Sequence, residues 1–409
     1  MDWKLVAVGP DRAAEVVDLT LWAFVEADIP DYAEHVAETL DWERSFGVEV
    51  DGRLVAFSSA WHFDLPVPGG VLPTGGLTWV GVHPGFRRRG MLRTMLARHF
   101  EDCRARGESA SILTAAEVPI YTRFGYGQAD RTVRTVLPRK VALRDVPGAE
   151  AVSITLERAD PAKHAEATAL VHRQHVGRPL FVPAGADGPW SARFHDPQQW
   201  RDGAEPLRVA VARRDGRPTG FAFFRRKEHW TPDAVPDGTV TVHELVANDP
   251  PTTRALWGML TDLDLMARTE ACSLPWDDPL FALLEDPRAV AARLGDRLHL
   301  RLLDVPEALS ARRYATGVEL VLEVSDAQVP TNAGRWRLTG GPDAARVEPA
   351  AGHADLRLDV RALGSVYAGG FPVASLAEAG LIEELTPGAV DKLAAALSYP
   401  RLPWTSHGF

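Results

Sequence analysis

One stretch of the chain, residues 77–105, has the pattern of a buried strand, a tight basic turn and a helix. The strand is the apolar run 77–82, which carries no charge and is typical of a strand covered on both faces. A short turn follows, and then three consecutive arginines and Gly90. From Met91 onward apolar residues recur at helical spacing, so the pattern predicts a helix that begins beside the arginines.

The start of this predicted helix suits an anionic ligand. The first backbone N–H groups of a helix lack an intrahelical partner, and a phosphate group satisfies them. Gly90 lets a ligand approach the backbone, and arginines add charge-assisted hydrogen bonds. The stretch contains neither the Gly-Lys-Ser/Thr of a P-loop nor a dinucleotide fingerprint. For the arginine run alone, a basic helix start on a solvated surface is the alternative.

The turn resembles motif A of the GCN5-related N-acetyltransferases (GNAT), Gln/Arg-x-x-Gly-x-Gly/Ala. Arg87 and Gly90 match that motif, whereas Leu92 departs from its last small residue. Residues 111–117 follow as a second apolar strand, and then Ile120-Tyr121-Thr122-Arg123-Phe124-Gly125-Tyr126-Gly127. Together these segments resemble the Eis (enhanced intracellular survival) acetyltransferases densely over about fifty residues, and the length and domain order are compatible over the whole chain.

The resemblance implies acetyl-CoA as co-substrate, entering where the strand after the motif A helix splays from its neighbour. Backbone groups around Val80 and Val82 would contact the pantetheine and the thioester carbonyl. The residues that would hold the pyrophosphate are Arg87, Arg88, Gly90, Met91 and Leu92. No metal site is expected, since His243-Glu244 lacks the second histidine of a zinc motif.

Two residues are expected to carry the chemistry. Tyr126 lies where the resembling enzymes usually have a catalytic tyrosine, and a tyrosine pKa of about 10 keeps it protonated and able to donate to a thiolate. Tyr121 is its competitor and fits a structural role better. The resemblance also implies that the terminal carboxylate of Phe409 acts as general base. His407, with a better-matched pKa, is the alternative base.

The chain is too long for one hydrophobic core, so several domains are expected. We expect an α+β protein with a catalytic GNAT domain at 1–147, a degenerate GNAT-like domain at 148–295 and a sterol-carrier-like domain at 296–409. The second domain repeats the order of elements, but its equivalent turn, residues 246–251, has a carboxylate in place of glycine and arginine. Asp51-Gly52 predicts a hairpin turn, 132–137 a strand, and the Pro/Gly clusters at 66–70 and 73–76 turns.

An acidic, aromatic segment near the N-terminus is the expected acceptor site. The residues proposed to form it are Trp22, Glu26, Asp28 and Trp42. A net charge of −10 suits cationic substrates and opposes general binding of nucleic acid. For any single carboxylate, a solvated helix face is the alternative.

Composition points to a cytoplasmic protein that does not bind membranes. The start of the chain lacks a signal-peptide pattern, no apolar run is long enough to span a membrane, and two cysteines make no disulfide framework. We therefore expect an N-acetyltransferase that moves an acetyl group to polycationic small molecules such as aminoglycosides, by direct transfer in a ternary complex. The alternatives are a protein lysine acetyltransferase and a non-catalytic lipid-binding protein. The resemblance further implies a homohexamer.

Overall fold

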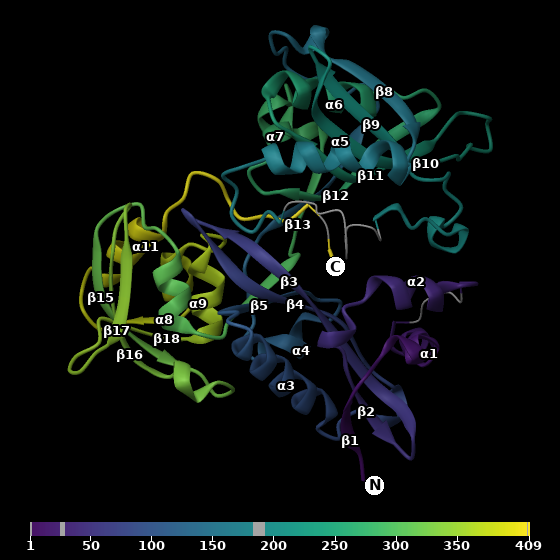
Figure 1. Cartoon of the computed structure of the whole chain (residues 1–409). Coiled ribbons are helices and arrows are strands. Elements are labelled where there is room, and N and C mark those ends of the chain that lie inside the picture. The colour runs from purple at the N-terminus through teal and green to yellow at the C-terminus, as the bar shows by residue number, and fades with distance from the viewer. Residues whose placement is uncertain (1, 25–28, 183–192, 407) are drawn as a thin grey trace. The chain divides into compact units, whose positions relative to one another are not determined.

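The computed structural model describes residues 2–24, 29–182, 193–406 and 408–409, which form three sheets with helices around them (Figure 1). The chain divides into two compact units. The first comprises residues 1–130, 178–182 and 297–409, and the second comprises residues 131–177 and 183–296. Each unit is therefore built from segments that lie far apart in the sequence.

The first sheet has the strand order β1-β2-β3-β4-β5-β14-β6. Its strands are β1 (Lys4–Ala7), β2 (Phe46–Val50), β3 (Arg53–Val67), β4 (Gly70–Val82), β5 (Ala110–Thr114), β14 (Leu298–Leu302) and β6 (Gly127–Gln128). Neighbours pair antiparallel except β4 and β5, which are parallel. Since β14 lies between β5 and β6, a strand from late in the sequence completes this sheet.

The hairpin between β2 and β3 confirms the predicted turn. Asp51 and Gly52 both have positive φ, 50° and 80°, as a type I′ turn requires. Of the two Pro/Gly clusters, 66–70 contains the predicted turn, at Pro68-Gly69 between the end of β3 at Val67 and the start of β4 at Gly70, whereas 73–76 lies within β4. Pairing of β3 with β2 ends at Ser58, so this part of the hairpin lies beyond β2, and Pro66 costs no ladder hydrogen bond there.

Within the described part of residues 1–130, four helices accompany the first sheet. They are α1 (Ala13–Phe24), α2 (Tyr32–Thr39), α3 (Met91–Ala105) and α4 (Val118–Thr122). The predicted helix after the arginines is thus confirmed as α3, which lies alongside β4 and β5 in Figure 1. Its buried face, which includes Leu96 and Phe100, packs with Leu77 of β4 and Leu113 of β5. This packing fixes the start of α3 beyond the end of β4.

The second unit contains a sheet in the order β13-β7-β12-β11-β10-β9-β8. Its strands are β7 (Thr132–Pro138), β8 (Ser153–Arg158), β9 (Arg208–Arg214), β10 (Arg217–Lys227), β11 (Gly238–Ala247), β12 (Met266–Pro275) and β13 (Ala291–Gly295), and its helices are α5 (Pro161–Gln174), α6 (Pro250–Thr261) and α7 (Pro279–Leu283). The predicted strand at 132–137 is present as β7, but it lies in this sheet. The domain ranges 1–147, 148–295 and 296–409 remain a prediction, and the compact units divide the chain at other residues.

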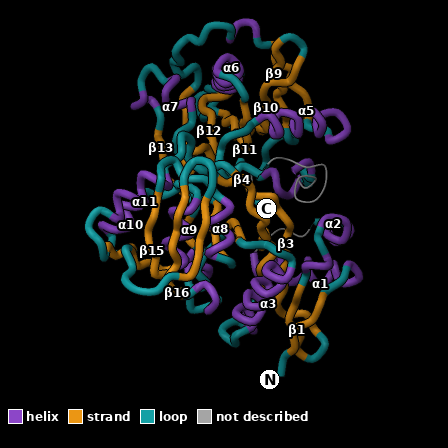
Figure 2. The backbone as a smooth tube through the Cα atoms, turned by 60° about the vertical axis from the view of Figure 1, so that its left-hand side comes forward, coloured by secondary structure: helices purple, strands orange, loops and turns teal. Residues whose placement is uncertain are grey.

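The C-terminal part of the first unit forms a five-stranded sheet with helices beside it (Figure 2). Its strands are β15 (Val318–Ser325), β16 (Gly334–Gly340), β17 (Ala345–Pro349), β18 (Leu356–Asp359) and β19 (Ile382–Glu384), and its helices are α8 (Val305–Ala311), α9 (Val360–Tyr367), α10 (Val373–Glu378) and α11 (Ala389–Leu397). Helix α9 packs on β14 and β6, and a Cβ at Gly364 would lie 2.6 Å from the Leu300 carbonyl oxygen. Arg301 of β14 also pairs with Asp326 at 2.7 Å, both fully buried, so this part is anchored to the first sheet.

Candidate active site

The turn between β4 and α3 presents an open helix start. Arg88 and Gly90 have φ of +64° and +87°, and Gly90 caps α3 without any side-chain hydrogen bond. A Cβ at Gly90 would meet nothing within 4 Å. Arg87, Arg88 and Gly90 are all exposed. Three of the predicted phosphate-binding residues therefore lie together at a helix start that no side chain of the turn covers.

The other two predicted residues of this helix start differ in exposure. The side chain of Met91 is buried in the core beneath the turn, and that of Leu92 is half-buried against the same core. Either residue can therefore offer an anion its backbone N–H, while its side chain serves packing.

A bulge interrupts β4 next to Val80. The register against β3 shifts between the pairs Phe57–Gly81 and Ser59–Thr78, and Trp79 within this interval has a φ of +53°. Positive φ is uncommon for a residue with a bulky side chain, and bulges cluster near functional sites. Val80 and Val82 are half-buried here. The sequence did not reveal the bulge, since its strand pattern is continuous.

Strands β4 and β5 pair over three residues only and then separate. The pairs are Thr74–Ala110, Gly75–Ser111 and Gly76–Ile112, although β4 continues to Val82. On its other side β5 pairs with β14 over its whole length, from Ala110 to Thr114. Consecutive strand residues face opposite sides of a sheet, so Gly75 and Gly76 face different layers at the point of separation.

The C-terminal Phe409 lies on one side of this point. Its ring centroid is 4.8 Å from that of Phe63, and a Cβ at Gly76 would come within 3.0 Å of its ring. Gly408 lies beside Thr114 of β5. The absence of a side chain at Gly76 thus makes room for the aromatic ring. Residue 407, the alternative base, lies outside the described residues.

Tyr126 lies on the other side, in the layer between the sheet and α3. It is fully buried, and its hydroxyl is 2.7 Å from Ser111 Oγ, which is also 2.7 Å from His99 Nε2. Burial raises the pKa of Tyr126 well above its usual value, and the hydrogen bond with Ser111 opposes that rise. Tyr121 packs edge-on against Tyr126, and burial raises its pKa to about 12. Both tyrosines therefore stay protonated at neutral pH.

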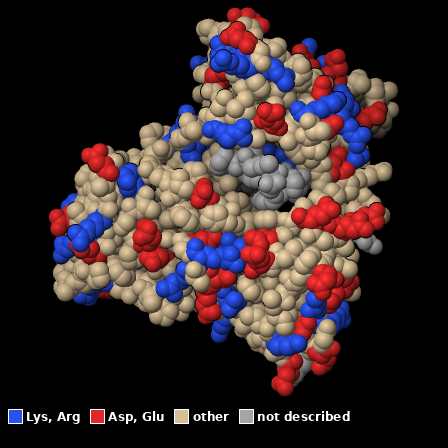
Figure 3. Space-filling model, viewed as in Figure 1, with Lys and Arg blue, Asp and Glu red and all other residues tan. Residues whose placement is uncertain are grey.

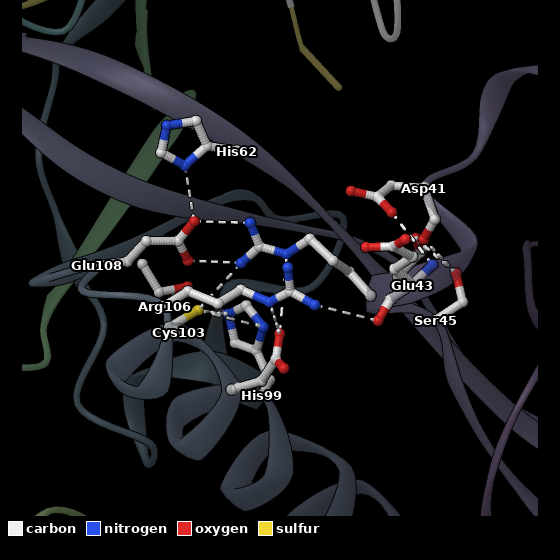
Figure 4. A network of polar contacts seen from close by, with 12 residues as sticks. Asp41, Glu43, Ser45, His62, His99, Cys103, Arg106 and Glu108 are labelled. Carbon is white, nitrogen blue, oxygen red and sulfur yellow. Dashed lines mark hydrogen bonds and ion pairs between the residues drawn. The ribbon is translucent and has the colours of Figure 1, made fainter.

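A buried ion pair occupies the same layer (Figure 4). Arg44 donates two hydrogen bonds to Glu108, of 2.6 and 2.5 Å, and Glu108 also contacts Nδ1 of His62 at 2.8 Å. Burial raises the pKa of Glu108, but the hydrogen bonds from Arg44 and His62 outweigh this effect and hold it below its usual range. A Cβ at Gly75 would lie 2.4 Å from Cys103 Sγ and 2.9 Å from Glu108, so Gly75 makes room for this group.

The predicted acceptor residues fall into separate surroundings. Trp22 is 55% exposed, and its ring lies 5.3 Å from that of His83 in the turn before α3. Trp42 is half-buried, donates its indole N–H to the Ala37 carbonyl at 2.9 Å and packs near Phe57. Glu26 and Asp28 lie outside the described residues. The exposed acidic residues on and next to α2 are Asp31, Glu34 and Glu38. In Figure 3 acidic side chains gather over the position of α2.

The equivalent turn of the second unit is closed. Helix α6 begins with Pro250 and Pro251, and the Asp249 carboxylate accepts a hydrogen bond of 2.8 Å from the N–H of Thr252. Arg214 pairs with the same carboxylate at 3.3 Å. A carboxylate of the chain itself therefore occupies the position that an anionic ligand would take.

Among the described residues, no group of three or more histidine, cysteine, aspartate or glutamate side chains could hold a metal ion. None of the described helices is both long and apolar enough to cross a membrane.

Known proteins resemble the chain over its whole length. The GNAT acetyltransferase domain family matches residues 7–129 and again 187–302, and the sterol carrier protein domain family matches 305–406. An uncharacterized N-acetyltransferase of Streptomyces avermitilis is 40% identical over 90% of both chains. N-acetyltransferase Eis of Mycobacterium bovis is 33% identical over 86% of this chain and 85% of its own. The crystal structure of Eis1 from Mycobacterium abscessus superposes with a TM-score of 0.83 over the full length of both chains, at 30% identity.

These matches confirm the predicted fold class, two GNAT domains followed by a sterol-carrier-like domain, and they confirm an acetyltransferase. On the combined evidence of motif, fold and sequence identity, the chain belongs to the Eis family of N-acetyltransferases.

Proposed function

We propose that the first unit transfers the acetyl group of acetyl-CoA to an amine of a cationic small molecule. The observation that carries this proposal is the separation of β4 from β5 after Gly76, with the open start of α3 beyond the end of β4. A long, thin co-substrate with a pyrophosphate can lie between the separated strands and place its phosphates at the helix start. Arg87 and Arg88 supply positive charge there. Gly90 lets the phosphates come close to the backbone, and Met91 and Leu92 offer their backbone N–H groups.

The thioester end of acetyl-CoA would lie near the bulge in β4. A bulge leaves a residue outside the regular ladder, so the backbone N–H groups around Val80 and Val82 are the candidates for contacting the pantetheine and polarising the carbonyl. The half-buried surroundings of both valines strengthen such hydrogen bonds, because electrostatic interactions are stronger where water is excluded.

Acetyl transfer also needs a proton donor for the departing thiolate and a group that holds the amine. Tyr126 is proposed as the donor, since it stays protonated at neutral pH and contacts Ser111, whose pair in β4 is the last but one before the strands separate. The α-carboxylate of Phe409 is proposed as the base, and the packing of its ring on Phe63 at the same point supports this role. The role requires that Phe409 ends the mature chain, which an intact mass checks.

Charge supports a cationic acceptor. The exposed carboxylates on and beside α2, with the aromatic side chains of Trp22 and Trp42, are proposed to contact it. We propose polyamine-like molecules such as aminoglycosides as the acceptor class, acetylated directly in a ternary complex. A cytoplasmic location, which rests on composition, and a homohexameric assembly, which rests on the family resemblance, are part of the same proposal.

The test is release of CoA thiol by the purified full-length protein supplied with acetyl-CoA and, in separate reactions, an aminoglycoside, a polyamine or a lysine peptide. Release with the first two and not with the peptide is the expected result. Release with the peptide alone would make the protein a lysine acetyltransferase. No release and no acetyl-CoA binding by calorimetry would contradict the proposal and favour a non-catalytic lipid-binding role.

The role of Phe409 has a separate test. Two residues appended after Phe409 should lower kcat, because they move the carboxylate away from the point where β4 and β5 separate. The same two residues placed before Met1 serve as control and should leave kcat unchanged. Full activity of the C-terminally extended protein would eliminate the carboxylate as the base.

A further inference from the structure

The buried layer beneath β4 and β5 contains a row of polar groups that ends on Tyr126. Ser111 Oγ lies between His99 Nε2 and the Tyr126 hydroxyl, at 2.7 Å from each. The thiol of Cys103 is 3.7 Å from His99 Nδ1 and 3.6 Å from His99 Nε2, and it accepts a hydrogen bond of 3.6 Å from Arg44. The side chains of Ser111, His99, Cys103 and Tyr126 are all buried, so they satisfy one another rather than water.

The number of protons limits how such a row can be arranged. Burial, followed by the charge of Arg44, lowers the pKa of His99 to about 3, so the ring is neutral and carries one N–H. A serine hydroxyl also has one proton and can donate once. When the serine proton lies within the row, the row runs in one of two directions, either from His99 through Ser111 to Tyr126 or the reverse.

Only one direction is compatible with a tyrosine that gives its proton to a thiolate. If Tyr126 donates to Ser111, its proton points into the core. If Ser111 donates to Tyr126, the tyrosine oxygen is an acceptor and its own O–H is available elsewhere. Once the proton has left, the phenolate can only accept, so Ser111 must then donate to it and His99 Nε2–H must donate to Ser111.

We propose that Ser111 and His99 are positioning residues for Tyr126, and that their hydrogen bonds run from His99 Nε2–H to Ser111 and from Ser111 O–H to the tyrosine oxygen. This inference rests on the proposed role of Tyr126 as proton donor. In the step it serves, the C–S bond of the thioester breaks as the C–N bond forms, the tyrosine O–H bond breaks, and the thiol S–H bond forms. The proton released by the amine equals the one that the phenolate regains, so no further reactant is needed.

Ionisable side chains face both ends of the row. Tyr126 is faced by Tyr121, by Cys103 of α3 and by Arg301 of β14, whose positive charge also favours the phenolate. His99 is faced by Cys103, Arg44 and Glu108. Arg44 and Glu108 pair with each other, so the imidazole stays neutral beside them. The direction of the row is therefore decided by its hydrogen bonds.

The experiment is a double-mutant cycle on the full-length protein with Ser111→Ala, Tyr126→Phe and their combination. We expect Ser111→Ala to lower kcat roughly tenfold, the worth of one hydrogen bond to a charged group, with KM for acetyl-CoA unchanged. The double variant should be no slower than Tyr126→Phe alone, because Ser111 acts only through the tyrosine.

Histidine variants test the direction of the row. The side chain of His99→Gln retains an N–H donor and should keep more activity than His99→Leu, which has none. Equal losses of kcat in the two histidine variants would overturn the proposed direction of the hydrogen bonds. If His99→Leu does not fold, the double-mutant cycle of Ser111 and Tyr126 decides alone. If the fold-losses in kcat of the two single variants multiply in the double variant, Ser111 does not act through Tyr126. That result would overturn this inference, while Tyr126 would remain the assigned acid. Full kcat in Tyr126→Phe would overturn both the assigned acid and this inference.

Discussion

The turn after β4 and the turn after β11 have the same topology and opposite chemistry. In both, a strand that pairs in parallel with its neighbour runs into a turn and a helix of the same layer, β4 into α3 and β11 into α6. The first three residues of α3 all carry N–H groups, and no side chain of the turn caps them. The first helix start is therefore suited to an anion, as the dipole and the free donors both favour one.

The second helix start has no donors left to offer. Pro250 and Pro251 lack an N–H group, Thr252 donates to the Asp249 carboxylate, and Thr253 donates to the Asp249 carbonyl at 3.1 Å. A phosphate placed there would meet a negative charge and no hydrogen bond. The comparison indicates that three adjacent residues are enough to remove the free N–H donors of this helix start while the strands and the helix stay in place.

The strongest test gives the first turn the carboxylate of the second. Gly90→Asp should weaken acetyl-CoA binding roughly hundredfold, because a carboxylate would cap α3, repel the pyrophosphate and strain a residue at positive φ. Calorimetry with acetyl-CoA measures the loss. Gly85→Asp places the same charge in the same turn away from the helix start, and it should lose far less. Equal affinities for the two variants would mean that the pyrophosphate lies elsewhere.

The interiors of the two helices predict different responses to acid. Helix α3 buries His99, whereas the buried residues of α6 are threonine, leucine and tryptophan. Because the pKa of His99 falls to about 3 in the folded chain, the unfolded chain binds more protons below about pH 6.5. The contribution of His99 to the free energy of unfolding is thus fully present above that pH. As the pH falls below it, this contribution decreases by about 1.4 kcal/mol per pH unit.

Hydrogen exchange of α3 and α6 peptides between pH 7 and 5 measures this difference. The free energy of opening should fall more steeply for α3, and His99→Gln should remove that extra slope. The exposed His353→Gln serves as control in the same unit. If α3 and α6 lose protection in parallel in both variants, His99 is not the source of the acid sensitivity.

The sequence predicted the parts of this comparison that depend on neighbouring residues. The arginine–glycine turn, the helix after it and the hairpin at Asp51-Gly52 follow from local patterns, and the missing glycine and arginine at 246–251 indicated a lost phosphate site. The structure adds the reason for the loss, since Asp249 and the two prolines together remove the donors.

What the sequence could not predict depends on pairing between distant segments. Strand β14 joins the first sheet from residue 298 onward, while β7 joins the second, and a local pattern does not specify which distant segment a strand pairs with. The bulge at Trp79 and the contact between Ser111 and His99 arise in the same way. Gly75-Gly76 within a strand was the one available signal, since glycine there indicates a close approach.

Charge alone should account for a smaller part of the difference between the two turns. Arg88→Ala should weaken acetyl-CoA binding roughly tenfold, the worth of one charge-assisted hydrogen bond, and should reduce its salt dependence. Arg104→Ala removes an exposed arginine from the far end of α3 and should change affinity little. A similar loss in both variants would indicate a general field rather than a contact at the turn.

The smallest effect should come from opening the second turn. Asp249→Ala removes the cap of α6 and should destabilise that helix by about 1 kcal/mol, measured as faster hydrogen exchange in α6 peptides. It should create no second acetyl-CoA site even though Arg214 loses its carboxylate partner, because Pro250 and Pro251 still lack N–H groups. Asp249→Asn keeps the cap and removes the charge, so it should retain most of the stability. A second binding event in the calorimetry of Asp249→Ala would mean that the carboxylate alone closes this turn and that the prolines contribute nothing.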